Sequence, residues 1–206
     1  MAFEITEQDR FILRQKFRFV VNEYVFSVPQ DDGVTPGEPF CFVRQKAFKF
    51  KEDIRFYTDK NMSVELLRIK ARHRFDPRAS YDVTDADGKK IGAIQKVFGA
   101  SMFRSTYRIM DAENQELATA REANLGVALA RRLVTVVPYL ENFANFLPIP
   151  YHFVFERNGV EIGSHRRQLF KFHDTYSIDV SADREQVVDR RLILAIAVGM
   201  DALQAR

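Results

Sequence analysis

The C-terminal segment of this chain is apolar on every side of the helix that it predicts. Residues 192–200 read LILAIAVGM, and further apolar residues flank this run at Val187, Val188 and Leu203. A surface helix carries a single apolar stripe, whereas this pattern covers too wide an arc for one. Nine residues are also too few to span a membrane, which takes about 20. The pattern therefore predicts a buried core helix over residues 183–205, capped by Asp183 and Gln186, which the rest of the chain must surround.

The chain before this helix repeats a strand–turn–strand unit that opens with tyrosine. The three aligned copies are YDVTDADGKKIGAIQK from Tyr81, YRIMDAENQELATARE from Tyr107 and YHFVFERNGVEIGSHRR from Tyr151. Asp87-Gly88 and Asn158-Gly159 predict tight hairpin turns of the primed types, in which both central residues have positive φ. An Ile-Gly or Leu-Ala pair then follows at a fixed distance. A fourth hairpin, without the glycine, fits residues 56–72.

These hairpins and the apolar helix together constrain the architecture. Further strands are predicted at residues 11–28, 40–50 and 171–180, and a short helical insertion near 122–146. About ten strands in successive hairpins can close around a helix that is apolar on all sides, and closure removes the exposed edges of the sheet. The 19 Phe and the absence of Trp suit a core of rings between helix and wall. We predict a mainly β (α+β) fold, a closed antiparallel barrel around a buried C-terminal helix, in a single domain over residues 1–206.

The ordered set of segments resembles the LURP-one-related family. The resemblance is carried by FVRQKAFKFKEDIRFYTD (42–59), LLRIKAR (66–72), the repeated hairpins and the closing DRRLILAIAVGMDALQ (189–204). That family is grouped with the tubby C-terminal and phospholipid scramblase proteins in one superfamily. The resemblance implies a twelve-stranded closed barrel threaded by a C-terminal hydrophobic helix. It also implies that basic residues could bind phosphoinositide headgroups, as in tubby proteins, although no tubby headgroup motif maps onto this sequence residue by residue.

Basic side chains alternate along several predicted strands, and alternation places them on one face of a sheet. The candidate phosphate-binding residues are Arg44, Lys46, Arg68, Lys70 and Arg72, and Arg14, Lys16 and Arg18 form a similar ladder. Residues 41–75 hold ten Lys and Arg against four Asp and Glu. If these strands adjoin, they form a basic flank on which Arg can hold phosphates bidentately. The alternative is the solvated outer wall of a barrel, paired locally with Glu52, Asp53 and Glu65.

A second candidate surface is the proline-broken apolar segment 133–155. The candidate membrane or partner contacts there are Arg131, Arg132, Phe143, Phe146 and Leu147. Cations beside aromatic and aliphatic side chains suit a membrane interface, with the charges toward the headgroups. A helical insertion that closes one end of the barrel, or a dimer contact, explains the same composition.

Catalytic and metal-binding patterns are absent from the sequence. The series Asp179, Ser181, Asp183, Glu185 has the spacing of an EF-hand loop, but Arg184 stands where glycine is required and Arg190 where a bidentate Glu is required. Cys41 lies between two phenylalanines, which predicts a buried thiol, and the four histidines lack metal-ligand spacing. We expect no enzyme activity, no catalytic residue, no metal and no cofactor.

The charge and the N-terminal sequence limit the partners and the compartment. The formal net charge of +3 is too small and local for a nucleic-acid surface, and no readout motif accompanies it. The N-terminus lacks the pattern of a secretory signal and the chain has one cysteine, so we expect a cytoplasmic protein that meets membranes peripherally.

Two functions remain open at this point. The first is a non-enzymatic, tubby-like binding module that engages phosphoinositides or other phosphorylated or lipid ligands at membrane surfaces. The second is a protein-interaction or structural barrel that self-associates through residues 122–147.

Overall fold

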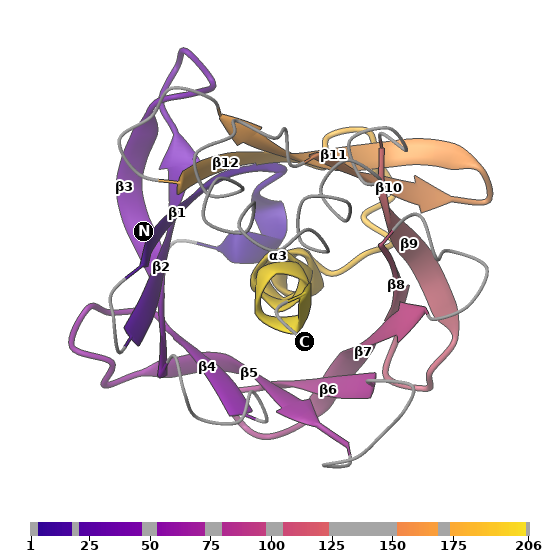
Figure 1. The fold of residues 1–206 in the computed structure, drawn as a ribbon, viewed down its shortest axis with the longest axis horizontal. Coiled ribbons are helices and arrows are strands. Elements are labelled where there is room, and N and C mark those ends of the chain that lie inside the picture. Colours follow the sequence, from indigo (N-terminus) through magenta and orange to yellow (C-terminus); the bar gives the residue numbers. More distant parts are fainter. Residues whose placement is uncertain are drawn as a thin grey trace, which may run out of the picture.

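A computed structural model describes residues 4–17, 21–46, 53–72, 80–97, 105–123, 152–168 and 174–204. Its strands form a closed barrel in which every neighbouring pair is antiparallel, and β12 closes the ring against β1 (Figure 1). The strands are β1 (Arg10–Phe17), β2 (Val21–Pro29), β3 (Pro36–Lys46), β4 (Asp53–Tyr57), β5 (Glu65–Ala71), β6 (Ser80–Asp85), β7 (Lys90–Val97), β8 (Thr106–Met110), β9 (Glu116–Glu122), β10 (His152–Arg157), β11 (Val160–Gln168) and β12 (Asp174–Asp179). The predicted fold class is confirmed, with twelve strands as the family resemblance implied.

Inside the barrel runs the helix α3 (Arg190–Gln204), as Figure 1 shows end-on. The short 3-10 helix η1 (Ile5–Glu7) packs against α3 at one end. Every residue of α3 from Leu192 to Met200 is buried. The apolar pattern thus predicted the surroundings of this segment correctly, because only a position enclosed by the sheet removes all of its sides from water.

The start of the helix differs from the prediction. We expected the helix to begin at Asp183, and it begins at Arg190, where Asp189 caps it by accepting a hydrogen bond at 2.8 Å from the amide of Arg191. The Asp183 carboxylate instead accepts hydrogen bonds from the amides of Val187 and Val188, within the loop that precedes the helix. An Asp followed three residues later by Gln suits a capping box, but here Asp183 is also bound to a buried arginine, described below.

The predicted hairpins are confirmed, and the structure explains the Ile-Gly and Leu-Ala pairs. In β6–β7, Gly92 lies opposite Val83 and Lys90 opposite Thr84, so Ile91 is the extra residue of a β-bulge. Ile162 in β11 and Leu117 in β9 occupy the same position. These bulged side chains pack on the core. Each bulge therefore adds one inward apolar side chain, and a small residue follows it.

Gly92 shows why the residue after the bulge must be small. A Cβ atom built there would lie 2.4 Å from the carbonyl oxygen of Met110 and 2.8 Å from a methyl group of Leu192 on α3. The helix and the neighbouring strand thus approach the backbone of Gly92 more closely than a side chain allows. At Gly163, a Cβ would meet the carbonyl oxygen of Asp179 at 2.5 Å.

One predicted turn is confirmed and another is wrong. Asn158 and Gly159 both have positive φ, as a primed turn requires. At Asp87-Gly88 only Gly88 does, because Asp85 accepts hydrogen bonds from the amides of Asp87 and Lys89 and makes a longer turn. Hydrogen bonds from backbone amides to a preceding Asp side chain are thus an alternative to the primed turn.

Several predicted boundaries also shift. The run at 11–28 forms the two strands β1 and β2, the strand at 40–50 already begins at Pro36 in β3, and the strand at 171–180 is β12. A helical insertion was predicted near 122–146. Its first residue, Glu122, is instead the last residue of β9, and residues 124–146 lie outside the described residues.

Aromatic rings fill much of the space between wall and helix. Phe11, Phe26, Phe56, Phe153 and Phe155 point inward and are fully buried. Phe26 stacks on Phe56 with ring centroids 6.4 Å apart, and Phe40 packs beside Phe11 at 5.9 Å. Such ring pairs add stabilisation beyond the apolar area that they bury.

Candidate functional site: a basic pocket on the outer wall

The predicted phosphate-binding residues lie on two strands that are not neighbours. Arg44 points outward from β3, whereas Arg68 and Lys70 point outward from β5, and Arg72 follows β5 directly. Strand β4 separates the two groups. Lys46 is the last residue of β3, and its side chain lies outside the described part of the structure. The alternation of the sequence therefore assigned the face correctly, but the ladders do not form one continuous row.

Carboxylates neutralise most of the group on β5. Arg68 donates to both oxygens of Glu65 at 3.1 Å and lies 3.6 Å from Asp53. Arg72 pairs with Asp82 at 2.8 Å, and Lys90 approaches the same carboxylate at 3.4 Å. Asp53 and Glu65 are two of the local partners that the alternative interpretation named. Arg68 and Arg72 thus have their charges compensated in place.

Arg44 instead belongs to a pocket of about 280 Å³ on the outer wall, which we call the basic pocket. Lys16 of β1, Arg44 of β3 and Lys60 of the β4–β5 loop contribute three cations to its lining. Glu23 of β2 is the carboxylate of this lining and pairs with Arg44 at 3.3 Å. Lys16 and Lys60 have no carboxylate within 4 Å in the part of the chain that the structure describes. The lining therefore keeps an excess of positive charge.

The register of the first three strands builds this pocket. Lys16 lies opposite Glu23, and Glu23 lies opposite Arg44, so all three stand in one outward row. In the adjacent row Val25 lies opposite Phe42, and these half-buried apolar side chains form the floor of the pocket. Charged groups thus surround an apolar patch, an arrangement that can hold an anionic group and a hydrocarbon group side by side.

The β4–β5 loop adds Lys60 and Met62 to the rim. Its conformation is fixed by Asp59, whose carboxylate accepts hydrogen bonds at 2.9 Å from the amides of Ser63 and Val64. These bonds, that of Val64 foremost, lower the pKa of Asp59. Met62 adopts a φ of 61° within this loop. The loop is therefore built around a charged aspartate, which positions Lys60 and Met62 over the strand wall.

The sequence indicated part of this pocket and missed the rest. Arg44 was a predicted ligand, and Lys16 belongs to the Arg14–Lys16 ladder that the alternation indicated. Lys60, Val25, Phe42 and Met62 were not predicted. The available signal was Val25 and Phe42, apolar residues on the outward side of their strands, but only the register shows that they meet.

Other candidate residues do not form a site. Cys41 is fully buried, and burial raises the pKa of its thiol. His165 is buried beside Tyr176, and desolvation lowers its pKa to about 3. Within the described ranges, no three His, Cys, Asp or Glu side chains come close enough to hold a metal ion.

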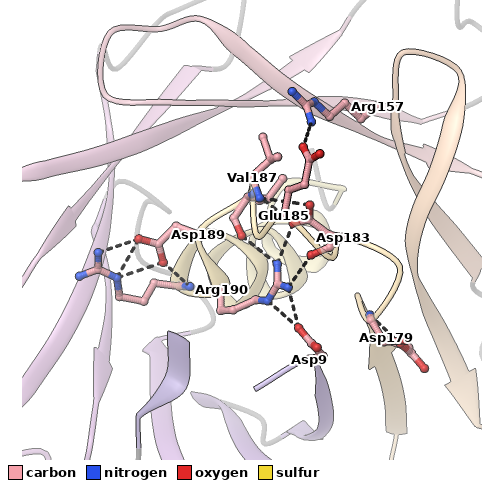
Figure 2. A network of polar contacts seen from close by, with 11 residues as sticks. Asp9, Arg157, Asp179, Asp183, Glu185, Val187, Asp189 and Arg190 are labelled. Carbon is pink, nitrogen blue, oxygen red and sulfur yellow. Dashed lines mark hydrogen bonds and ion pairs between the residues drawn. The ribbon is translucent and has the colours of Figure 1, made fainter. Parts of the chain in front are cut away.

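The carboxylates with EF-hand-like spacing serve separate local roles. Asp179 accepts hydrogen bonds from the amide and hydroxyl of Ser181. Asp183 faces Arg190, and Glu185 pairs with Arg157 at 3.5 Å (Figure 2). Their side chains point to different partners and do not converge on a common centre.

Most of the predicted membrane or partner segment 133–155 lies outside the described residues, but its end, residues 152–155, belongs to β10, where Phe153 and Phe155 are buried in the core. The candidate contacts Arg131, Arg132, Phe143, Phe146 and Leu147 lie outside the described residues, as do residues 124–147 of the insertion through which self-association was predicted. Among the helices that the structure does describe, none combines the length and the apolar character that crossing a bilayer requires.

Comparison with known proteins identifies the family. A family model described as LURP-one-related matches residues 41–201, from within β3 to within α3. Neither the curated proteins nor the solved structures give a match. The matched range begins at Cys41 within β3 and continues into the helix, and it leaves out β1 and β2 and with them Lys16 and Glu23 of the basic pocket. Since the match spans well over half of the 206 residues, the chain belongs to the LURP-one-related family.

Proposed function

We propose that this barrel is a non-enzymatic binding module that engages anionic lipid headgroups, phosphoinositides among them, at the surface of a membrane. The observation that carries the proposal is the basic pocket, in which Lys16, Arg44 and Lys60 surround the apolar Val25 and Phe42. The family and the closed barrel are consistent with a tubby-like binding module.

The chemistry of the pocket suits a headgroup attached to acyl chains. Arg44 offers a guanidinium that can hold a phosphate bidentately, and the two lysines add charge that attracts it from a distance. Phe42, Val25 and Met62 can contact the acyl region once the cations lie among the headgroups. Attraction of this kind contributes about 1 kcal/mol per basic side chain near an anionic surface and weakens with salt.

Arg68, Lys70 and Arg72 have a supporting role in the proposal. They lie beyond β4 on the same outer wall, and the carboxylates around Arg68 and Arg72 reduce their net attraction. A headgroup that binds them must displace or share these carboxylates, which makes the basic pocket the preferred place for the phosphate.

Sedimentation with liposomes tests the proposal. Neutral phosphatidylcholine vesicles are compared with vesicles that also contain phosphatidylinositol 4,5-bisphosphate, at low salt. We expect binding to the second kind only, and a loss of about a hundredfold in the triple variant K16Q/R44Q/K60Q, since each of the three lost cations removes about 1 kcal/mol.

The matched control carries three charge removals elsewhere on the same wall. R68Q/K70Q/R72Q changes the net charge equally but leaves the basic pocket intact, so its binding should fall less. All six side chains lie at the surface, and thermal melts check that both variants fold. Equal and negligible sedimentation with both vesicle types overturns lipid binding, and a greater loss in the control variant overturns the pocket as its site.

A further inference from the structure

A second and larger pocket, of about 500 Å³, lies on another part of the outer wall. Strands β1, β11 and β12 form its base, and residues 30–35, the loop between β2 and β3, cover one side through Gly33 and Val34. We call this loop the strap. The Gln168 side-chain amide donates to the carbonyl of Val34 at 3.3 Å, which ties the strap to β11. A pocket of this size can enclose a small molecule.

The strap has a defined conformation of its own. Asp32 accepts hydrogen bonds from the amides of Val34 and Thr35, at 2.9 and 2.7 Å. These bonds and that of Gln168 hold Gly33 and Val34 of the strap at one side of the pocket.

The register of β11 and β12 gathers polar side chains on the base. Arg166 lies opposite Ser177, and Ser164 lies opposite Asp179, with all four pointing outward. Asp179 is compensated by Arg10 of β1, whose Nε lies 3.0 Å from its carboxylate. The Ser177 hydroxyl donates to the carbonyl oxygen of Arg166 at 3.5 Å, whereas the Ser164 hydroxyl can donate to an anion beside the Arg166 guanidinium.

Arg166 differs from most arginines described on this barrel. Within the described residues it has no carboxylate within 4 Å, whereas Arg10, Arg44, Arg55, Arg68, Arg72 and Arg121 each have one. Its Nε–H donates to Nε2 of His152 at 3.0 Å. That bond fixes one edge of the guanidinium and leaves the Nη groups as donors. Partial burial and the charge of Arg166 lower the pKa of His152, so the imidazole stays a neutral acceptor near pH 7.

We propose that the strap pocket binds a small ligand that carries a phosphate or carboxylate group, held by the Nη groups of Arg166 and the hydroxyl of Ser164. The fixed guanidinium lowers the entropy cost of binding, and among the described residues no carboxylate lies within 4 Å of it, although Glu161 also lines the pocket. This site is separate from the basic pocket and does not depend on lipid binding there. The anionic group could belong to a free small molecule or to a lipid headgroup.

Titration with two soluble probes, inorganic phosphate and 3-phosphoglycerate, tests the proposal by NMR at constant ionic strength. We expect amide shifts at Ser164, Arg166 and Ser177 and in the strap at Gly33 and Val34. R166Q should weaken the binding of 3-phosphoglycerate by tenfold or more, since a charge-assisted hydrogen-bond pair is lost. The affinity of R166K for 3-phosphoglycerate should lie between those of R166Q and the unaltered protein, because lysine keeps the positive charge but lacks the paired donors of a guanidinium.

The matched control is R157Q, which removes an arginine that pairs with Glu185 outside the pocket. It should leave the titration unchanged, as should K16Q/R44Q/K60Q. Equal affinity of R166Q and the unaltered protein, or shifts spread evenly over the basic side chains of the surface, would overturn the proposal.

Liposome sedimentation of R166Q then separates the two sources of the anion. If R166Q no longer binds 3-phosphoglycerate but still binds phosphoinositide vesicles as before, the ligand is a free small molecule. If it loses both, the anion belongs to a headgroup, and the strap pocket is a lipid site in its own right. Lipid binding that depends on Lys16 and Arg44 alone leaves the strap pocket as a site for soluble anions.

Discussion

The guanidinium of Arg190 and the carboxylate of Asp183 form an ion pair, with Nη1 and Oδ2 2.8 Å apart, buried where α3 begins (Figure 2). Only 1% of the Arg190 side chain and 4% of that of Asp183 are exposed. Asp9, just before β1, adds a second carboxylate at 2.6 Å. This network joins the start of the first strand, the loop after the last strand and the helix inside the barrel.

Breaking this pair should destabilise the barrel strongly. In R190M the Asp183 carboxylate keeps its loop amides but loses its buried counter-charge, a change that costs about 3–5 kcal/mol of unfolding free energy. Urea unfolding measures the loss. R157M is the control, because its partner Glu185 is exposed, and it should cost about 0.5 kcal/mol or less. Similar losses in the two variants would contradict the assigned role of the buried pair.

Gly92 should tolerate no side chain. G92A places a Cβ against the Met110 carbonyl oxygen and the Leu192 methyl groups, and we expect a cost of about 1–3 kcal/mol or more from overpacking. G88A is the comparison. Gly88 has a φ of +79° and nothing within 4 Å of the added Cβ, so it should cost only about 1 kcal/mol of backbone strain. If G92A were as stable as the unaltered protein, the close approach of α3 to β7 would be wrong.

His165 should make the stability fall in acid. Its pKa is about 3 in the folded protein, below the value of about 6.5 expected when unfolded, so the unfolded state binds the proton first. Its contribution is complete above about pH 6.5 and is lost as the pH falls toward 3. At pH 4.5 the loss is roughly 2–3 kcal/mol.

Urea midpoints of the unaltered protein and of H165L at pH 7 and pH 4.5 measure this contribution. The variant lacks the titrating group, so its stability should fall less between the two pH values, while the carboxylates titrate equally in both. The same pH dependence in both proteins would show that the folded state does not lower the pKa of His165.

Cys41 should be unreactive until the barrel opens. Burial raises the pKa of its thiol, so little thiolate forms in the native protein, and the reagent cannot reach the sulfur. We expect reaction with 5,5′-dithiobis(2-nitrobenzoic acid) at pH 8 to be slower than that of free cysteine by about a thousandfold or more. In guanidinium chloride one thiol per chain should react at once. Fast native labelling would contradict the position of Cys41 inside β3.

Local sequence patterns were enough to predict the repeating elements. Hairpins follow from alternation and turn residues, and the Ile-Gly and Leu-Ala pairs at fixed distance already showed that these positions are equivalent. What those pairs do could not be predicted, because a bulge is defined by the partner strand. The predicted start of α3 was wrong because it also depends on tertiary contacts. Asp183 resembles a helix cap in the sequence, but its carboxylate binds Arg190 and the loop amides.

For the candidate site, the sequence assigned side chains to a face but not to neighbours. Arg44 and Arg68 looked alike, as cations alternating along strands. In the barrel, Arg44 meets Lys16 and Lys60 around an apolar floor, whereas Arg68 meets Glu65 and Asp53. Arg166 was not predicted as a ligand. What distinguishes it is that the described carboxylates lie more than 4 Å from its guanidinium, and the sequence does not show such distances.

The sequence by itself determined that this chain closes a sheet of hairpins around its own C-terminal helix, since a helix apolar on all sides is stable only when it is enclosed. The tertiary structure alone decided which charges remain available to a ligand. Register and closure set which side chains of different strands meet, and a cation attracts an anion strongly only where no carboxylate has been placed beside it.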